Sequence, residues 1–315
     1  MSERVEHHRP WRLGHAVARY RDHRQQSTHL TIDAFQVSSG LLLLALVVHP
    51  PGETPLVARL VFALGLVLPM VSRRFATFWF VALVLFVASP LERAWLTLDN
   101  HEVLQVYWLA AFALSRFADR PMAVLRSTAR WTLALVFVFA TLWKLLAPDF
   151  VDGSAIEFFF GVEQRVGDVA VAAGLQPEGR VEHNWEQLEQ WLDATATPED
   201  IDNDVTPLLQ QVSVGLAWAT IVLEAAVAVV FLLPLPAHRR WVRDATLIAF
   251  VLLTYPIAPV LPFAWLLLSM GAMQSELPEK RLRRAYVVTF FVVTFVYGLR
   301  QWTILPGLEF LSGVG

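Results

Sequence analysis

Long apolar stretches, separated by short polar connections, run through most of the chain. Their lengths exceed what the core helix of a soluble domain needs and approach the ~20 residues that cross a bilayer as a helix. The pattern predicts nine such helices, at 33–49, 55–72, 75–90, 102–117, 129–147, 211–235, 242–258, 260–274 and 284–304. We therefore predict an all-α integral membrane protein with about nine transmembrane helices.

Basic residues between these stretches indicate how the helices are oriented. They cluster in the first 30 residues and again at Arg73–Arg74, Arg116–Arg130, Arg239–Arg243 and Lys280–Arg284. Of the alternate connections, those near 50–55 and 258–260 and the C-terminus carry no basic residue, and 91–97 carries only Arg93. Loops rich in Lys and Arg stay on the cytoplasmic side of a membrane. We therefore expect a multi-pass protein of the cell membrane with a cytoplasmic N-terminus and an extracytoplasmic C-terminus.

The composition supports this class and divides the chain. Hydrophobic residues make up 56% and charged residues 17%, and the absence of cysteine excludes disulfides and thiolate metal ligands within the chain. Residues 148–210 hold 14 of the 28 acidic residues and two arginines, which makes one acidic extracytoplasmic loop. We expect three parts: a cytoplasmic segment (1–30), a transmembrane domain that includes this loop (31–275), and a last helix with the C-terminal tail (276–315).

The acidic loop contains two apolar segments of its own. Residues 154–174 are typical of an interfacial helix, and 184–193 predict a short helix with Asn184 as its N-cap. Two interpretations remain open at this point. The loop is either a lid over an outward-facing cavity or a solvated segment with two amphipathic helices.

Lys144 is the first candidate for chemistry. It is one of only two lysines, against 23 arginines, and it lies inside an apolar helix of membrane-spanning length. Ionisable residues inside such helices are costly, and a desolvated lysine can lose its proton and act as a base. The alternative is that Lys144, about three residues from the outer end of its helix, extends its side chain to the lipid headgroups.

Other polar residues occupy the same helices. Asn100–His101 opens the fourth stretch, either as a polar site at the depth of Lys144 or as a simple helix start. Glu224 lies near the middle of the sixth stretch. A carboxylate at that depth fits two roles equally well, a buried structural hydrogen bond or a step in a proton path. Because it is about 20 Å below the outer end of its helix, we expect no direct ion pair with Lys144. Asp149 and Asp152 are better placed to hold the lysine. No metal site is predicted.

At these residues the chain resembles the HTTM (horizontally transferred transmembrane) domain, the membrane portion of vitamin K-dependent gamma-carboxylase and its bacterial relatives. The segment ATLWKLLAPDFVDG (140–153) is similar to the family's Ala-Gly-x-x-Lys-Leu…Asp-Trp-x-x-Gly signature, with Thr141 in place of its glycine. Asn100–His101 resembles an Asn-His pair at the head of an earlier span. Glu224 falls on an acidic position of a later one. The order and spacing agree over roughly residues 30–275.

The resemblance implies a function. Lys144 would be the base towards a reduced lipid quinone of the vitamin K type, with His101 and Asn100 at the same quinone site and Asp149, Asp152 and Glu224 around it. The expected activity is then a carboxylase-like or oxygenase-like oxidation of the quinol, lost in Lys144→Met. The alternatives are a non-catalytic module that binds a lipid or quinone or holds a partner protein through residues 148–210, and a small-solute or proton transporter that uses Glu224. A nucleic-acid partner is not expected.

Overall fold

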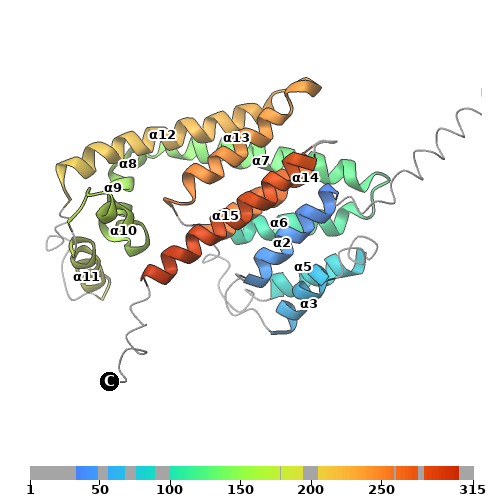
Figure 1. The fold of residues 1–315 in the computed structure, drawn as a ribbon, viewed down its shortest axis with the longest axis horizontal. Helices are drawn as coiled ribbons and strands as arrows, with labels where there is room; N and C mark the ends of the chain where they lie inside the picture. The colour runs from blue at the N-terminus through green and yellow to red at the C-terminus, as the bar shows by residue number, and fades with distance from the viewer. Residues whose placement is uncertain are drawn as a thin grey trace, which may run out of the picture. The chain divides into compact units, whose positions relative to one another are not determined.

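Residues 33–48, 56–67, 76–88, 100–177, 179–193, 205–258, 260–275 and 280–304 are described by a computed structural model of the protein. These residues form thirteen α-helices and one 3₁₀ helix, so the fold class is all-α (Figure 1). Contacts divide the chain into Met1–Asp33 and Ala34–Gly315, and all helices of the described residues belong to the second unit.

The helices occur where the apolar pattern predicts them. The N-terminal half contains α2 (Ala34–Val48), α3 (Leu56–Val67), α5 (Ala76–Ala88), α6 (Asn100–Ser115) and α7 (Pro121–Leu146). The acidic loop contains α8 (Pro148–Val151), α9 (Ser154–Val162), α10 (Gln164–Ala172) and α11 (Arg180–Leu192). The C-terminal half contains α12 (Pro207–Leu232), η3 (Ala237–Arg239), α13 (Trp241–Thr254), α14 (Leu261–Gln274) and α15 (Lys280–Ile304).

Each of the nine predicted apolar stretches thus contains a helix, but their lengths differ. Within the described ranges, α7 and α12, of 26 residues each, are long and apolar enough to cross a membrane. Both begin at a proline, which is pre-organised for the first turn of a helix. The structure therefore shows two candidate spans, and the remaining seven stay a prediction.

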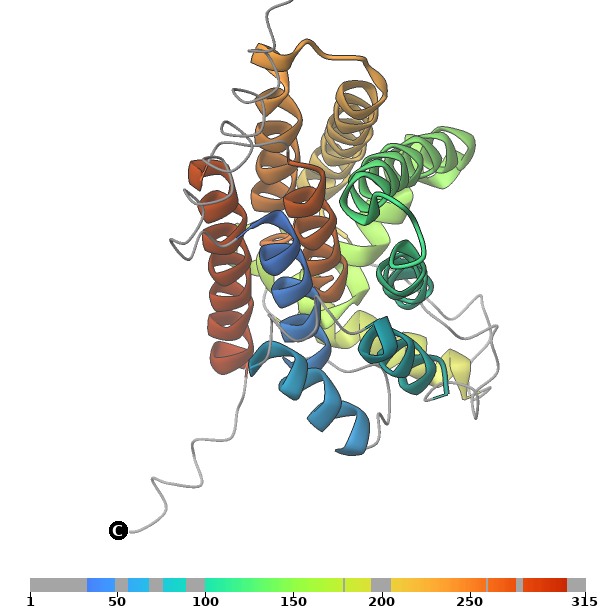
Figure 2. The ribbon, with the colours of Figure 1, turned by 90° about the vertical axis from the view of Figure 1, so that its right-hand side faces the viewer.

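Helix α14 lies at the centre of the packing. Every residue of α14 except Phe263 is buried, as expected for a helix that is apolar on all sides. It contacts α2, α6, α7, α13 and α15 (Figure 2). A Cβ at Gly271 would lie 2.5 Å from the Tyr286 ring, so this glycine permits the close approach of α15.

Buried hydrogen bonds fix the neighbours of α14. Ser269 donates to the Ser38 carbonyl (2.9 Å) and accepts from the indole of Trp108 (2.9 Å), which connects α14 with α2 and α6. On another side, the buried carboxylate of Asp244 accepts from Gln274 Nε2 and from the Tyr286 hydroxyl, both at 2.7 Å. This second group joins α13, α14 and α15.

Helices α7 and α12 pack side by side along much of their length (Figure 1). Arg130, early in α7, donates to the carbonyls of Phe231, Leu232 and Leu233 at the end of α12. Lys144, late in α7, contacts Glu224, further back in α12. The two helices are therefore antiparallel.

The first turns of α12 carry the acidic loop. Phe160, Val166, Ala170 and Leu209 form a small core of their own between α9, α10 and α12. Thr206 caps α12 by accepting from the Leu209 amide, and its hydroxyl donates to the Leu175 carbonyl after α10. This part of the loop is packed against α12 rather than solvated.

The predicted N-cap role of Asn184 is wrong. Helix α11 begins at Arg180, so Asn184 lies inside it, where its side chain is buried and donates to the Gly161 carbonyl (2.9 Å). The prediction failed because Asn favours both caps and buried tertiary hydrogen bonds, and only the packing of α11 on α9 separates the two.

Candidate ligand pocket beside Lys144

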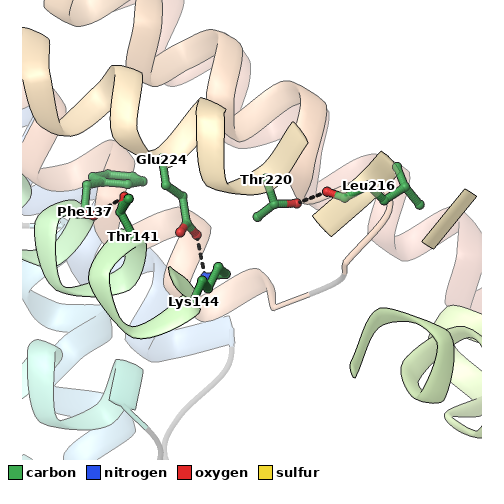
Figure 3. Close-up of polar contacts among 6 residues, drawn as sticks. All are labelled: Phe137, Thr141, Lys144, Leu216, Thr220 and Glu224. Carbon is green, nitrogen blue, oxygen red and sulfur yellow. Dashed lines mark hydrogen bonds and ion pairs between the residues drawn. The ribbon is translucent and has the colours of Figure 1, made fainter. Parts of the chain in front are cut away.

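Lys144 forms an ion pair with Glu224. Its Nζ lies 2.8 Å from Glu224 Oε1, and the side chains are 21% and 9% exposed. Figure 3 shows the two side chains pointing toward each other from α7 and α12. The expectation that Glu224 lies too deep to pair with Lys144 is therefore wrong.

Two features of the helix pair explain this error. Helix α12 begins four residues before its predicted start, and its first turns extend past the end of α7 to pack on α9 and α10. Side chains on a helix also lean toward its N-terminus, so in an antiparallel pair they lean toward each other. The depth of Glu224 measured along α12 therefore overstates its distance from Lys144.

A short turn after α7 places an aromatic ring against the lysine. Nζ of Lys144 lies 5.3 Å from the centroid of the Phe150 ring in α8, within the range of a cation–π contact. The turn ends at Gly153, whose φ is +90° and whose Cβ position would lie 2.7 Å from the Val214 amide nitrogen. Only glycine fits this close approach to α12 without strain.

The two aspartates of this turn, Asp149 and Asp152, make their contacts within the turn itself. Asp152 is exposed and accepts from the amide and the hydroxyl of Ser154 (2.9 and 2.7 Å). Both hydrogen bonds lower the pKa of Asp152, and the bond from the backbone amide has the larger effect. Asp149 is exposed, and its backbone carbonyl accepts from the Ser154 hydroxyl. The aspartates thus shape the turn, and Glu224 is the carboxylate that holds Lys144.

A pocket of about 360 Å³ opens beside the lysine. Its walls come from the ends of α7 and α13, from α8, α9 and α10, and from one face of α12. The lining residues are Lys144, Phe150, Ile156, Phe159, Phe160, Glu163, Val166, Leu216, Ala219, Thr220, Leu223, Leu253, Thr254, Ile257, Ala258 and Val260. Most of them are apolar, and Lys144 and Glu163 are the two ionisable ones. The α9–α10 segment of the acidic loop therefore forms one side of the pocket.

The remaining predicted residues lie elsewhere or behind the pocket wall. Asn100 and His101 are the first residues of α6, and neither lines the pocket. Glu224 stands behind Lys144, where its second oxygen, Oε2, is buried and makes no hydrogen bond within the described part of the chain. Tyr255, directly after α13, is buried.

Sequence reasoning missed most of the pocket wall. Phe159, Phe160 and Glu163 belong to the segment that it assigned to an interface. The lining residues within 253–258 fall at the end of one predicted span, and Val260 falls at the start of the next. The one available signal was the apolar cluster SAIEFFF (154–160) inside an acidic loop. Among the described residues, no group of three or more His, Asp or Glu side chains could hold a metal ion.

Comparison with families of known proteins, with curated proteins and with solved structures found no match. The class of the protein follows from the fold: an all-α protein in which two long apolar helices, α7 and α12, could cross a membrane. The pocket beside Lys144 is the feature of this fold that points to a function.

Proposed function

We propose that the protein is a multi-pass membrane protein that binds a lipid quinol, or the corresponding quinone, with its polar head beside Lys144. One observation carries the proposal. A pocket with mostly apolar walls presents a single amine, and that amine is held in place by Glu224 and by the Phe150 ring.

The size and lining of the pocket fit this ligand class. Its volume lies at the lower end of the range, about 300–1,000 Å³, of small-molecule sites. Three phenylalanines, Phe150, Phe159 and Phe160, offer ring faces and edges to a planar head. The ammonium of Lys144 keeps N–H groups beyond the one used by Glu224, and these can donate to a ring oxygen.

A proton transfer is the catalytic part of the proposal, and the resemblance to the HTTM domain motivates it. A quinol hydroxyl gives its proton to Lys144 Nζ while Nζ passes a proton to Glu224 Oε1, 2.8 Å away. The products are a quinolate, a lysine ammonium beside it and a protonated Glu224. Asn100 and His101 have no role in this proposal, because neither lines the pocket.

The nine-span topology of an HTTM-type protein is part of the same proposal. Large apolar side chains are exposed along both candidate spans, on faces that a bilayer would cover. They include Trp131, Phe139 and Trp143 on α7, and Trp218, Val222 and Val229 on α12. The helices found in the seven other apolar stretches are compatible with further spans.

The test compares the wild type with a variant that removes the amine. Lys144→Met alone would leave the Glu224 carboxylate buried without a partner, which typically costs about 3–5 kcal/mol, so the variant is Lys144→Met combined with Glu224→Gln. Lipids that co-purify in mild detergent are identified by mass spectrometry. On the same samples, the oxidation of added quinol is measured with dissolved O2 as the acceptor of its two electrons. We expect a quinone enriched in the wild type and absent from the variant, with oxidation lost in parallel.

The outcomes separate binding from chemistry. A bound quinone without oxidation would retain the binding function and reject the proton transfer. Equal amounts of bulk phospholipid and no quinone in both samples would reject the proposal, provided that both proteins elute as monodisperse species.

A further inference from the structure

The pair of Lys144 and Glu224 is electrically neutral as a unit. With Nζ and Oε1 2.8 Å apart, the shared proton lies on the amine or on the carboxylate. An ammonium with a carboxylate and an amine with a carboxylic acid both have a net charge of zero. The amine that faces the pocket therefore brings no excess positive charge, whichever form dominates.

The other residues that line the pocket add no positive charge to it. Lys144 is the one basic residue among those that line the pocket, and the other ionisable lining residue, Glu163, is acidic. The Glu224 side chain is 9% exposed and its Oε2 is buried without a hydrogen-bond donor in the described structure. Water therefore screens the Glu224 charge only weakly, and the carboxylate offsets the charge of Lys144.

We propose that Glu224 is a specificity determinant: by neutralising Lys144, it makes the pocket accept lipids with uncharged, oxygen-bearing heads and reject lipids with anionic heads. This inference rests on the proposed function, since it concerns the ligand class of the same pocket. Binding of a quinol does not by itself require a carboxylate behind the lysine. The selection against anionic lipids gives Glu224 a role of its own.

The need for such a device follows from the membrane itself. Bilayers contain anionic lipids in large excess over any minor neutral ligand, and carboxylates and phosphates form strong charge-assisted hydrogen bonds with a lone ammonium. Specificity against an abundant competitor is achieved by placing a like charge where the competitor would bind. An anionic head at Nζ would meet the Glu224 carboxylate directly behind it and Glu163 on the pocket wall.

The test uses two probes of the same chain length, decanol with an uncharged hydroxyl head and decanoate with an anionic carboxylate head. The full-length protein is placed in nanodiscs of a zwitterionic lipid at about pH 8.5, where a carboxylic acid is ionised. Binding of each radiolabelled probe is measured after subtraction of its partition into empty nanodiscs. The variants are Glu224→Gln, which keeps the shape of the side chain, and Glu186→Gln, the same change on the exposed surface of α11.

We expect the wild type and Glu186→Gln to bind decanol at least about tenfold more tightly than decanoate. In Glu224→Gln the affinity for decanoate, relative to that for decanol in the same protein, should rise by about tenfold or more. The gain should disappear when Lys144→Met is added to Glu224→Gln, because the attracting charge is then gone.

Each other result overturns the inference. Equal binding of the two probes by the wild type rejects it without any variant, so the test does not depend on the folding of Glu224→Gln. A folded Glu224→Gln protein with an unchanged preference for decanol also rejects it, and both of these results leave the proposed lipid site intact. Binding of neither probe above the empty-nanodisc level also rejects the inference, whereas the proposed function is rejected only by the lipid analysis of wild type and double variant.

Discussion

At the scale of single residues, Gly153 connects the backbone to the pocket. It has φ +90°, and a Cβ there would lie 2.7 Å from the amide nitrogen and 2.9 Å from the Cα of Val214. Because the obstacle is the backbone of α12, the turn that carries Phe150 would have to move away. We expect Gly153→Ala to lower the free energy of unfolding by about 1–3 kcal/mol more than Gly174→Ala.

Gly174 is the matched control for this prediction. Its φ is +70°, but no atom lies within 4 Å of its Cβ position, so alanine there meets backbone strain without a clash. Thermal unfolding of both variants in detergent gives the comparison. Equal destabilisation would show that the close approach of Gly153 to α12 contributes nothing.

The candidate residues differed in how well sequence could place them. Lys144 stood out because a lone lysine in an apolar helix is unusual by composition, and the pocket is found beside it. The partner of Lys144 was predicted wrongly, since the stagger of α7 against α12 is a property of tertiary packing that helix periodicity does not give. Asp244 was missed because its partners, Gln274 and Tyr286, come from two other helices. Pairing across helices is not encoded in local periodicity.

At the scale of helices, the C-terminus of α12 depends on two arginines. The Val230 carbonyl lacks its usual donor because the residue four positions later is Pro234, which has no N–H group. Arg243 supplies that donor at 3.0 Å and also donates to the Leu233 carbonyl at 2.7 Å, while Arg130 donates to Phe231. A cation at this end also interacts favourably with the helix dipole.

We expect Arg243→Met to lower the free energy of unfolding by about 2–3 kcal/mol, because it leaves carbonyl groups at the end of α12 without donors. Arg239→Met removes the same charge from an exposed position of η3 and should change stability by less than about 0.5 kcal/mol. Denaturant unfolding of the two variants in detergent measures the difference. Similar values for both would assign the effect to net charge rather than to these hydrogen bonds.

The existence of the long helices was more predictable than their lengths. Apolar runs identify every helix from α2 to α7 and from α12 to α15, because burial and lipid exposure both demand apolar side chains. The same runs do not separate a spanning helix from a buried one. Helix α14 has 14 residues and is apolar and almost entirely buried. Helix α7 has 26 residues and exposes apolar side chains along its length.

At the scale of the whole molecule, the antiparallel pair of α7 and α12 connects orientation with chemistry. Near one end of the pair, Arg130 and Arg243 bind the last carbonyls of α12. Toward the other end, Lys144 and Glu224 face each other beside the pocket, and α9 and α10 pack on the overhanging turns of α12. If the arginine end lies in the cytoplasm, the pocket opens near the outer leaflet and the acidic loop lies outside.

The absence of cysteine from the natural sequence makes this orientation directly measurable. Single cysteines introduced by Glu186→Cys in α11 and Arg239→Cys in η3 replace exposed side chains on the two sides that the topology separates. In spheroplasts of a bacterial host, a membrane-impermeant maleimide should label Glu186→Cys at once and Arg239→Cys only after the membrane is permeabilised. The reason is that arginine-rich connections stay in the cytoplasm while the acidic loop is exported. Labelling of both positions without permeabilisation would show that α12 does not cross the membrane, and the reverse pattern would place the pocket near the inner leaflet.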